Sequence, residues 1–361
     1  MTMKYAFTNG KILDVSRDMQ VQTGRCILVK NGKIHDIVSD TTDLSGYTKI
    51  DLKGHYILPG LINMHVHLAG SGKPQKKQRD NEKLVNTIMS TSLTRAIAYR
   101  MVAGFAKDEL LSGVTTIRTV GGLGDFDTRL RDEIKAGSKI GPRILASNQG
   151  ISVPGGHMAG SVAVAASSIP DALSHLKKSE QQKVDLIKLM ITGGVLDAKE
   201  KGVPGELKMP PEMVRAVCEK AHADGYLVAA HVESPEGVRV ALENGVDSIE
   251  HGAKLTDEMV KLFKERGAFL CTTISPALPY ALFDRSITNA TKRSAELTDI
   301  DSITGSIEKG KAADLIVTAQ NPLKDLKALR NLEMVISGGR FIEHPKIKKR
   351  KQVEAELDKF L

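Results

Sequence analysis

The sequence predicts an α/β fold: a TIM-like (β/α)8 barrel with a small β-sandwich domain formed from both chain termini. Three observations favour this class. Apolar strand-like segments alternate with helix-like segments across residues 59–304, and β-rich segments with tight turns occur at both ends of the chain. The length of 361 residues suits a large barrel with a small appended domain.

The two ends of the chain read as short strands. Asn9-Gly10 and Asn31-Gly32 each separate two β-rich runs, and Asn-Gly in this position predicts a hairpin. Near the other end, ADLIVT and MVISGGRFI are also β-rich. Because the two ends of a domain often lie close together, we assign residues 1–58 and 305–345 to one small β domain. Residues 346–361 are predicted to form a basic helix or tail.

The middle of the chain carries the barrel pattern. Helix-like segments follow apolar runs, and one of them opens with Ser234-Pro235-Glu236, an N-cap followed by proline at the first helical position. Near-continuous apolar strands between helices indicate a parallel sheet covered on both faces. Seven such strands predict the (β/α)8 barrel. They are LINMHVHL, VTTIRTV, PRILAS, DLIKLM, YLVAAHV, DSIEHG and AFLCTTIS.

Composition narrows the class of protein. The net charge is +8, but the sequence has no Trp and only 4% aromatic residues, which argues against stacking on nucleic-acid bases. The basic runs at 73–79 and 346–351 are interpreted as solvated segments, with an anionic partner as the alternative. Three unpatterned cysteines favour a reducing compartment. No apolar leader or membrane span is seen, so we expect a cytoplasmic protein that binds neither membranes nor nucleic acid.

Histidines gather where barrel strands end. His65 and His67 lie two positions apart on the first strand and therefore face the same way, while His231 and His251 end two later strands. Active sites of barrels form at the C-terminal ends of the strands. Neutral imidazoles are common metal ligands, so four of the ten histidines at one end of three strands predict a metal centre.

Lys188 lies inside the apolar strand DLIKLM. A buried and unpaired ammonium group is strongly unfavourable. Lys188 must therefore be paired, neutral or chemically modified. An ordinary ion pair with an inward carboxylate is the alternative to a functional role.

Five segments occur in an order that resembles the amidohydrolase superfamily: GLINMHVHL, IKLMITGG, AAHVES, SIEHG and GSIEKGKAADLIV. The similar branch is related to imidazolonepropionase and includes Xaa-Pro dipeptidase-like and arginine/lysine carboxypeptidase-like enzymes. The resemblance implies two divalent metal ions, expected to be zinc. His65 and His67 would bind one ion, His231 and His251 the other, and a carboxylated Lys188 would bridge both.

The implied function is hydrolysis of a peptide or amide bond by a metal-bridging hydroxide. The expected substrate is a dipeptide or another small molecule, as for a dipeptidase or carboxypeptidase. A cyclic amide hydrolase similar to imidazolonepropionase is one alternative, and a catalytically degenerate barrel that acts as a binding protein is another. Because dimers and larger rings are common among such relatives, we leave open that this protein forms a homo-oligomer.

One part of the family pattern has no match. The family's last metal ligand is an Asp that ends the eighth barrel strand, and near residues 283–290 the chain passes directly into a helix-like segment. A βαβ unit needs about 30 residues. We therefore expect that this sequence omits residues of the full protein, the alternative being a genuine deletion. Without that Asp, His251 and His157 are the candidate catalytic residues for proton transfer.

Further residues are candidates for substrate binding. By the resemblance, His157 in a Gly-rich segment contacts a substrate carboxylate, although a solvent-exposed loop histidine is the alternative. Gly193 and Gly194 are expected to shape the pocket wall. Glu233 could attract a cationic substrate group or simply stabilise a helix N-terminus. Arg118 could pair with a substrate carboxylate or with a neighbouring acid.

Overall fold

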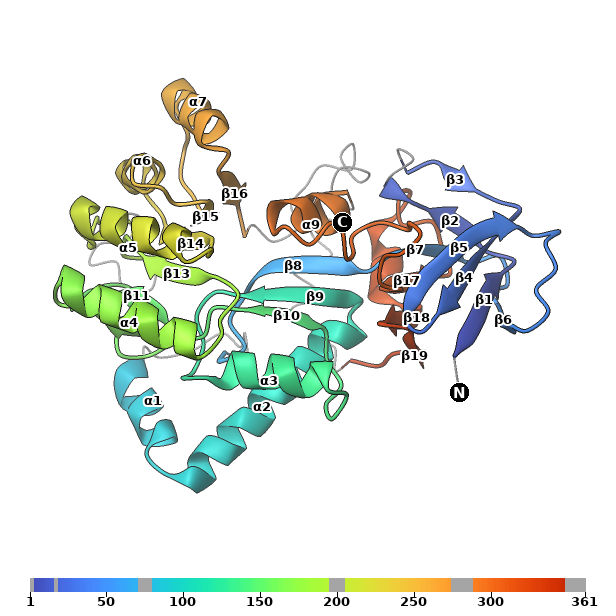
Figure 1. The fold of residues 1–361 in the computed structure, drawn as a ribbon, viewed down its shortest axis with the longest axis horizontal. Helices are drawn as coiled ribbons and strands as arrows, with labels where there is room; N and C mark the ends of the chain where they lie inside the picture. Colours follow the sequence, from blue (N-terminus) through green and yellow to red (C-terminus); the bar gives the residue numbers. More distant parts are fainter. Residues whose placement is uncertain (1–2, 16–18, 71–79, 195–204, 274–287, 348–361) are drawn as a thin grey trace. The chain divides into compact units, whose positions relative to one another are not determined.

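The computed structural model describes residues 3–15, 19–70, 80–194, 205–273 and 288–347 (Figure 1). The chain divides by its internal contacts into two compact units. Unit 1 comprises Met1–Asn63, Ala106–Thr116 and Ser275–Leu361, and unit 2 comprises Met64–Phe105 and Ile117–Ile274. The domain boundaries drawn from the sequence stay a prediction, and the expected basic helix lies largely outside the described residues.

Unit 1 contains two β-sheets, and one of them joins strands from both ends of the sequence. Strand β17 pairs antiparallel with β7, placing Ile316 opposite Leu58. Apolar side chains from both sheets share one buried cluster that includes Phe7 and Leu315. The first sheet has the order β5(Lys33–Ser39), β4(Arg25–Lys30), β1(Lys4–Thr8), β6(Thr48–Asp51); the second has the order β19(Arg340–Glu343), β18(Leu332–Ser337), β17(Leu315–Thr318), β7(Tyr56–Pro59), β2(Lys11–Leu13), β3(Val21–Gln22).

One of the two predicted Asn-Gly hairpins is confirmed and the other is wrong. Asn31 and Gly32 both adopt positive φ and connect the antiparallel strands β4 and β5. The strands on either side of Asn9-Gly10, β1 and β2, instead lie in different sheets. In this second pair only Asn9 has a positive φ. Glycine at position 10 lets the backbone pass close to the Leu52 side chain, because an added Cβ would lie 2.5 Å from Leu52 Cδ1.

All seven strands predicted for the middle of the chain are present, and the α/β class with parallel strands is confirmed. Every pair in the six-stranded sheet is parallel. Two short strands, β11 and β12, were not predicted. The six-stranded sheet has the order β12(Ala163–Ala165), β11(Gly150–Ser152), β13(Ile187–Met190), β14(Val228–Val232), β15(Ser248–His251), β16(Phe269–Cys271); a three-stranded sheet has the order β10(Arg143–Ala146), β9(Val114–Thr119), β8(Leu61–Val66).

Helices alternate with these strands along the chain. The predicted N-cap at Ser234 is confirmed, because its side chain accepts a hydrogen bond from the Gly237 amide. No described helix is both long and apolar enough to cross a lipid bilayer. The helices are α1(Asn81–Met89), α2(Ser92–Leu111), α3(Phe126–Lys135), α4(Ile169–Gln181), α5(Pro211–Ala223), α6(Pro235–Glu243), α7(Asp257–Arg266), the π-helix η3(Asn289–Arg293), α9(Ser294–Leu297) and the 3-10 helix η4(Leu326–Arg330).

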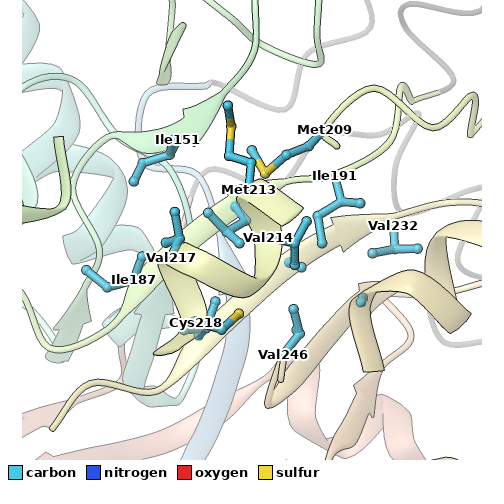
Figure 2. Close-up of a cluster of buried hydrophobic side chains, with 14 of the residues drawn as sticks. Ile151, Ile187, Ile191, Met209, Met213, Val214, Val217, Cys218, Val232 and Val246 are labelled. Atoms are coloured by element: carbon cyan, nitrogen blue, oxygen red, sulfur yellow. The ribbon is translucent and has the colours of Figure 1, made fainter. Parts of the chain in front are cut away.

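The core of unit 2 lies between the parallel strands and their helices (Figure 2). Met213 and Val217 of α5 belong to one buried cluster with Ile187 of β13 and Val232 of β14. Alternate residues of a strand face opposite sides of the sheet. The residues between these apolar positions therefore project away from the helices, and one of them is Lys188.

Candidate metal centre

Strand alternation assembles the polar face of the six-stranded sheet. Ile187, Ala230 and Ile249 belong to the apolar core beside the helices. The alternate positions are Lys188 on β13, His231 on β14 and Glu250 on β15, and His231 stands directly opposite Glu250 in the parallel register. Because side chains alternate along each strand, these three polar groups share the face opposite the core. The same two-residue alternation that places the apolar residues in the core therefore places these three polar residues at the site.

His65 and His67 are brought together as predicted, and their partners define their tautomers. His65 Nδ1 lies 2.7 Å from Glu250 Oε2, and His67 Nδ1 lies 3.0 Å from the Gly121 carbonyl oxygen. A carboxylate and a carbonyl only accept hydrogen bonds, so each Nδ1 carries the proton. In the neutral rings each Nε2 then holds a lone pair. The two Nε2 atoms face each other at 3.2 Å.

Burial keeps these two rings neutral. It lowers the pKa of His67 to about 4, helped by the nearby His65 ring, and it also lowers the pKa of His65. Near neutral pH, two lone pairs therefore point at one another without a proton between them. This arrangement is repulsive by itself and becomes favourable when both nitrogens coordinate the same cation.

His251 reaches the same group of rings by an unusual backbone turn. It ends β15 with φ of 69°, a left-handed conformation that is uncommon for a residue other than glycine. Strict strand alternation would place His251 on the face opposite Glu250. Instead its ring centroid lies 4.6 Å from that of His65 and 4.7 Å from that of His231. Such strained residues concentrate at functional sites.

Lys188 is the most deeply buried cation of the site. Its side chain is 1% exposed, and Nζ forms no hydrogen bond with any residue that the structure describes. Burial lowers the pKa of Lys188 to about 8, although the negative charge of Glu250 acts in the opposite direction. About a tenth of the amine is therefore neutral and nucleophilic near pH 7. The simple ion pair considered as an alternative is not formed among these residues.

Glu250 was missed in the sequence analysis. It is fully buried and accepts hydrogen bonds from His65, from Arg118 Nη2 at 2.6 Å and from the Ser248 hydroxyl. Burial opposes ionisation of Glu250, but Arg118 and His65 outweigh it and lower the carboxyl pKa. Strand alternation in SIEHG could have found this residue, since Glu250 lies two positions after the inward Ser248. For Arg118 this placement favours the neighbouring acid over a substrate carboxylate.

The other predicted substrate-binding residues gather around His231. The rings of His157 and His231 stack with centroids 3.9 Å apart and planes 8° apart. Gly194 permits this stack, because an added Cβ would lie 2.7 Å from His157 Cε1 and 3.1 Å from His231 Cε1. The Gly193 oxygen lies 3.3 Å from His231 Nε2, and Glu233 Oε1 lies 4.0 Å from the same atom. Their roles with a substrate stay predictions.

Two groups of described residues have the composition of metal ligands. One is His231, Glu233 and His251, and the other is His65, Glu250 and Cys271, each with donor atoms within 4.8 Å of one another. Cys271 was not singled out from the sequence. Burial raises the pKa of its thiol to about 12, so the sulfur stays protonated in the metal-free protein.

The predicted gap in the barrel falls mainly outside the described residues. Residues 274–287 are not described, and the described chain resumes just before the π-helix Asn289–Arg293. The expectation that an eighth strand and its Asp are missing near residues 283–290 therefore stays a prediction.

Comparisons with known proteins agree with this fold. A model of the amidohydrolase family matches residues 56–280. Ochratoxinase from Aspergillus niger is 23% identical over 276 residues, which cover 69% of this chain and 55% of ochratoxinase. The chain thus spans about half the length of the curated relatives it matches.

Solved structures match over nearly their full length. A candidate prolidase from Bifidobacterium longum is 29% identical with a TM-score of 0.78, and the match covers 99% of this chain and 98% of that one. A Xaa-Pro dipeptidase solved with bound methionine is 27% identical with a TM-score of 0.79, covering 94% of this chain and 100% of that one.

Proposed function

This chain belongs to the amidohydrolase family, and from that premise we propose that it is a metal-dependent hydrolase of peptide or amide bonds. The proposal includes a complete (β/α)8 barrel and a β-sandwich built from both termini. It also includes a dipeptide or a similar N-acylated amino acid as substrate. The solved structures named as dipeptidase and prolidase support this substrate class over a cyclic amide.

The observation that carries the proposal is the opposed pair of imidazole nitrogens. His65 and His67 each donate from Nδ1 and present an unprotonated Nε2 to the other at 3.2 Å. Both rings are kept neutral by burial. A divalent cation such as Zn²⁺ would convert the repulsion into two coordinate bonds. These two residues would hold one metal ion, and His231 with His251 would hold a second.

Lys188 fits the same centre. Its buried Nζ lacks a hydrogen-bond partner among the described residues, and its lowered pKa leaves part of the amine neutral. The neutral amine can attack carbon dioxide: a C–N bond forms, one proton leaves the nitrogen, and a carbamate anion results. This anion would bridge two cations and would remove the cost of a buried ammonium group.

Bound metal ions would supply a Lewis acid for the substrate carbonyl and a water of lowered pKa. The chain itself orients the ligands, through Glu250 for His65 and through the Gly121 carbonyl for His67. His157, which is stacked on His231, would hold the substrate beside the metal ligands. Glu233 would attract a cationic group of the substrate. His251 and His157 are the described candidates for moving the proton to the leaving amine.

Metal content and hydrolysis of a substrate panel test the proposal together. We expect the purified full chain to retain divalent metal and to cleave at least one member of a panel of Xaa-Pro dipeptides, N-acyl amino acids and cyclic amides. The intact mass in neutral buffer should exceed the chain mass by one carbon dioxide. The variant His67→Asn should lose metal and activity, whereas His35→Asn, an exposed histidine of β5, should lose neither.

Each contrary result has a meaning. A chain that binds metal but cleaves nothing in the panel would favour the binding-protein alternative. A chain that hydrolyses peptides equally well after His67→Asn would overturn the metal centre. Cleavage confined to cyclic amides would replace the peptide substrate with the second substrate class.

A further inference from the structure

Glu250 has no lone pair left for a metal ion. A carboxylate offers about four acceptor positions. His65 Nδ1 at 2.7 Å, Arg118 Nη2 at 2.6 Å and the Ser248 hydroxyl donate to it, and the Cys271 thiol makes a further hydrogen bond. The side chain is fully buried. The group His65, Glu250 and Cys271 therefore has the composition of a metal site, but its donors and acceptors already satisfy each other.

We propose that Glu250 is a positioning residue: together with Arg118, it holds the proton of His65 on Nδ1 and so presents Nε2 as a metal ligand. The inference rests on the metal centre proposed above and deepens it. Arg118 is essential to the arrangement because a guanidinium group can only donate hydrogen bonds. It occupies one carboxylate oxygen of Glu250 and leaves the other oxygen facing His65. Carboxylates behind a metal-bound histidine act in this way in other metal sites.

The isosteric variant Glu250→Gln gives this proposal a specific consequence. Arg118 would donate its hydrogen bond to the amide oxygen of the glutamine, because the amide nitrogen cannot accept it. The amide nitrogen would then face His65 Nδ1 and donate to it. His65 would have to accept at Nδ1 and carry its proton on Nε2. That proton would point at His67 Nε2, 3.2 Å away, and the ligand position would be lost.

Two measurements on the full chain test this consequence. Nitrogen NMR of the histidine rings in the metal-free protein should show His65 protonated at Nδ1 in the wild type and at Nε2 in Glu250→Gln. Competition with a chromogenic chelator should show that Glu250→Gln binds Zn²⁺ about 10–100-fold more weakly. The matched control is Glu109→Gln, a half-buried glutamate that accepts a hydrogen bond from Asn63 on a different part of the chain. Its zinc affinity should equal that of the wild type.

The outcomes separate this inference from the proposed function. A wild-type His65 protonated at Nε2 overturns the inference, even if the variant does not fold. So does a Glu250→Gln protein that keeps the wild-type tautomer or the wild-type zinc affinity. Equal zinc losses in Glu250→Gln and Glu109→Gln would indicate a general structural effect and would also overturn it. A wild type that shows the expected tautomer but binds no zinc would instead count against the proposed metal centre.

Discussion

Hydrogen-bond acceptors next to individual histidines determine what those histidines can bind. The Gly121 carbonyl and the Glu250 carboxylate each take a proton from an Nδ1 atom. Each Nε2 atom therefore carries a lone pair before any ion arrives. Gly121 itself has φ of 133° and brings its backbone within contact of the His67 ring, where a Cβ would lie 3.1 Å from Cε1.

Acid should destabilise the metal-free protein through these rings. Unfolded His67 takes up a proton near pH 6.5, whereas the folded protein resists protonation until pH falls to about 4. The unfolded state thus binds more protons in this window, and the free energy of unfolding falls as pH falls. His67 alone would account for about 3 kcal/mol, and it contributes no pH dependence above pH 6.5.

Denaturant unfolding in the presence of a chelator measures this effect. We expect His67→Asn to reduce the loss of stability across the window and His35→Asn to leave it unchanged. A His67→Asn protein with the full wild-type acid sensitivity would contradict this assignment.

The stack of His157 on His231 depends on the absence of a side chain at Gly194. We expect Gly194→Ala to displace His157, since the new Cβ would lie 2.7 Å from its ring. The value of kcat/KM on a cleaved substrate should fall by roughly tenfold or more, in line with the cost of small displacements at a reacting centre. The neighbouring Gly193→Ala places its Cβ 3.9 Å from the nearest atoms and should cause a smaller loss. Equal losses would show that the stack is unimportant.

At the scale of elements, the alternation of side chains along the strands determines which residues face the site. Strands β13, β14 and β15 each send apolar residues to the helices and polar residues to the opposite face. Backbone turns at the ends of the strands then add residues that alternation cannot place. His251 is the clearest case, because its left-handed φ brings its ring to the side occupied by His65 and His231.

Helix α2 contains a glycine that nothing in the fold explains. Gly104 is exposed in the helix interior, and an added Cβ would meet nothing within 4 Å. Because alanine loses less backbone entropy in a helix, Gly104→Ala should raise the free energy of unfolding by about 0.5–1 kcal/mol. Gly60→Ala should have the opposite effect, about 1–3 kcal/mol of destabilisation, because its Cβ would overlap the Thr115 side chain. Denaturant midpoints check both signs, and a stabilising Gly60→Ala would be inconsistent with this packing.

At the scale of the whole molecule, the candidate centre lies entirely within one compact unit. Every described site residue from His65 to Cys271 belongs to unit 2, whereas unit 1 holds two β-sheets, one of which joins strands from both ends of the sequence. The residues of the candidate centre and the two β-sheets of unit 1 therefore belong to different compact units.

Zinc should stabilise unit 2 selectively. A ligand at about 100 times its Kd stabilises the folded state by about 2.7 kcal/mol. Hydrogen exchange should therefore slow in β13, β14 and β15 when Zn²⁺ is added to the metal-free protein. The amides of β4 and β5 in unit 1 provide the internal control and should change little. Uniform protection across both units would contradict a centre confined to unit 2.

The sequence by itself determined the α/β class, the seven strands, the histidines at the ends of three of them and the lysine buried inside another. It could do so because strand period, glycine turns and the cost of a buried lysine are local properties of the chain. The hairpin at Asn31-Gly32 was predicted correctly from such local properties. The same dipeptide at Asn9-Gly10 instead connects strands of two different sheets, which local sequence does not reveal.

Only the tertiary structure decided which groups pair with one another. Arg118 and Glu250 lie 132 positions apart, and His65 and Glu250 lie 185 positions apart, so no local pattern could join them. The tautomers of His65 and His67, the stack of His157 on His231 and the isolation of Lys188 Nζ all depend on such distant contacts. Residue types and their spacing specify the candidates for chemistry, while packing between distant strands sets their protonation states and their orientation.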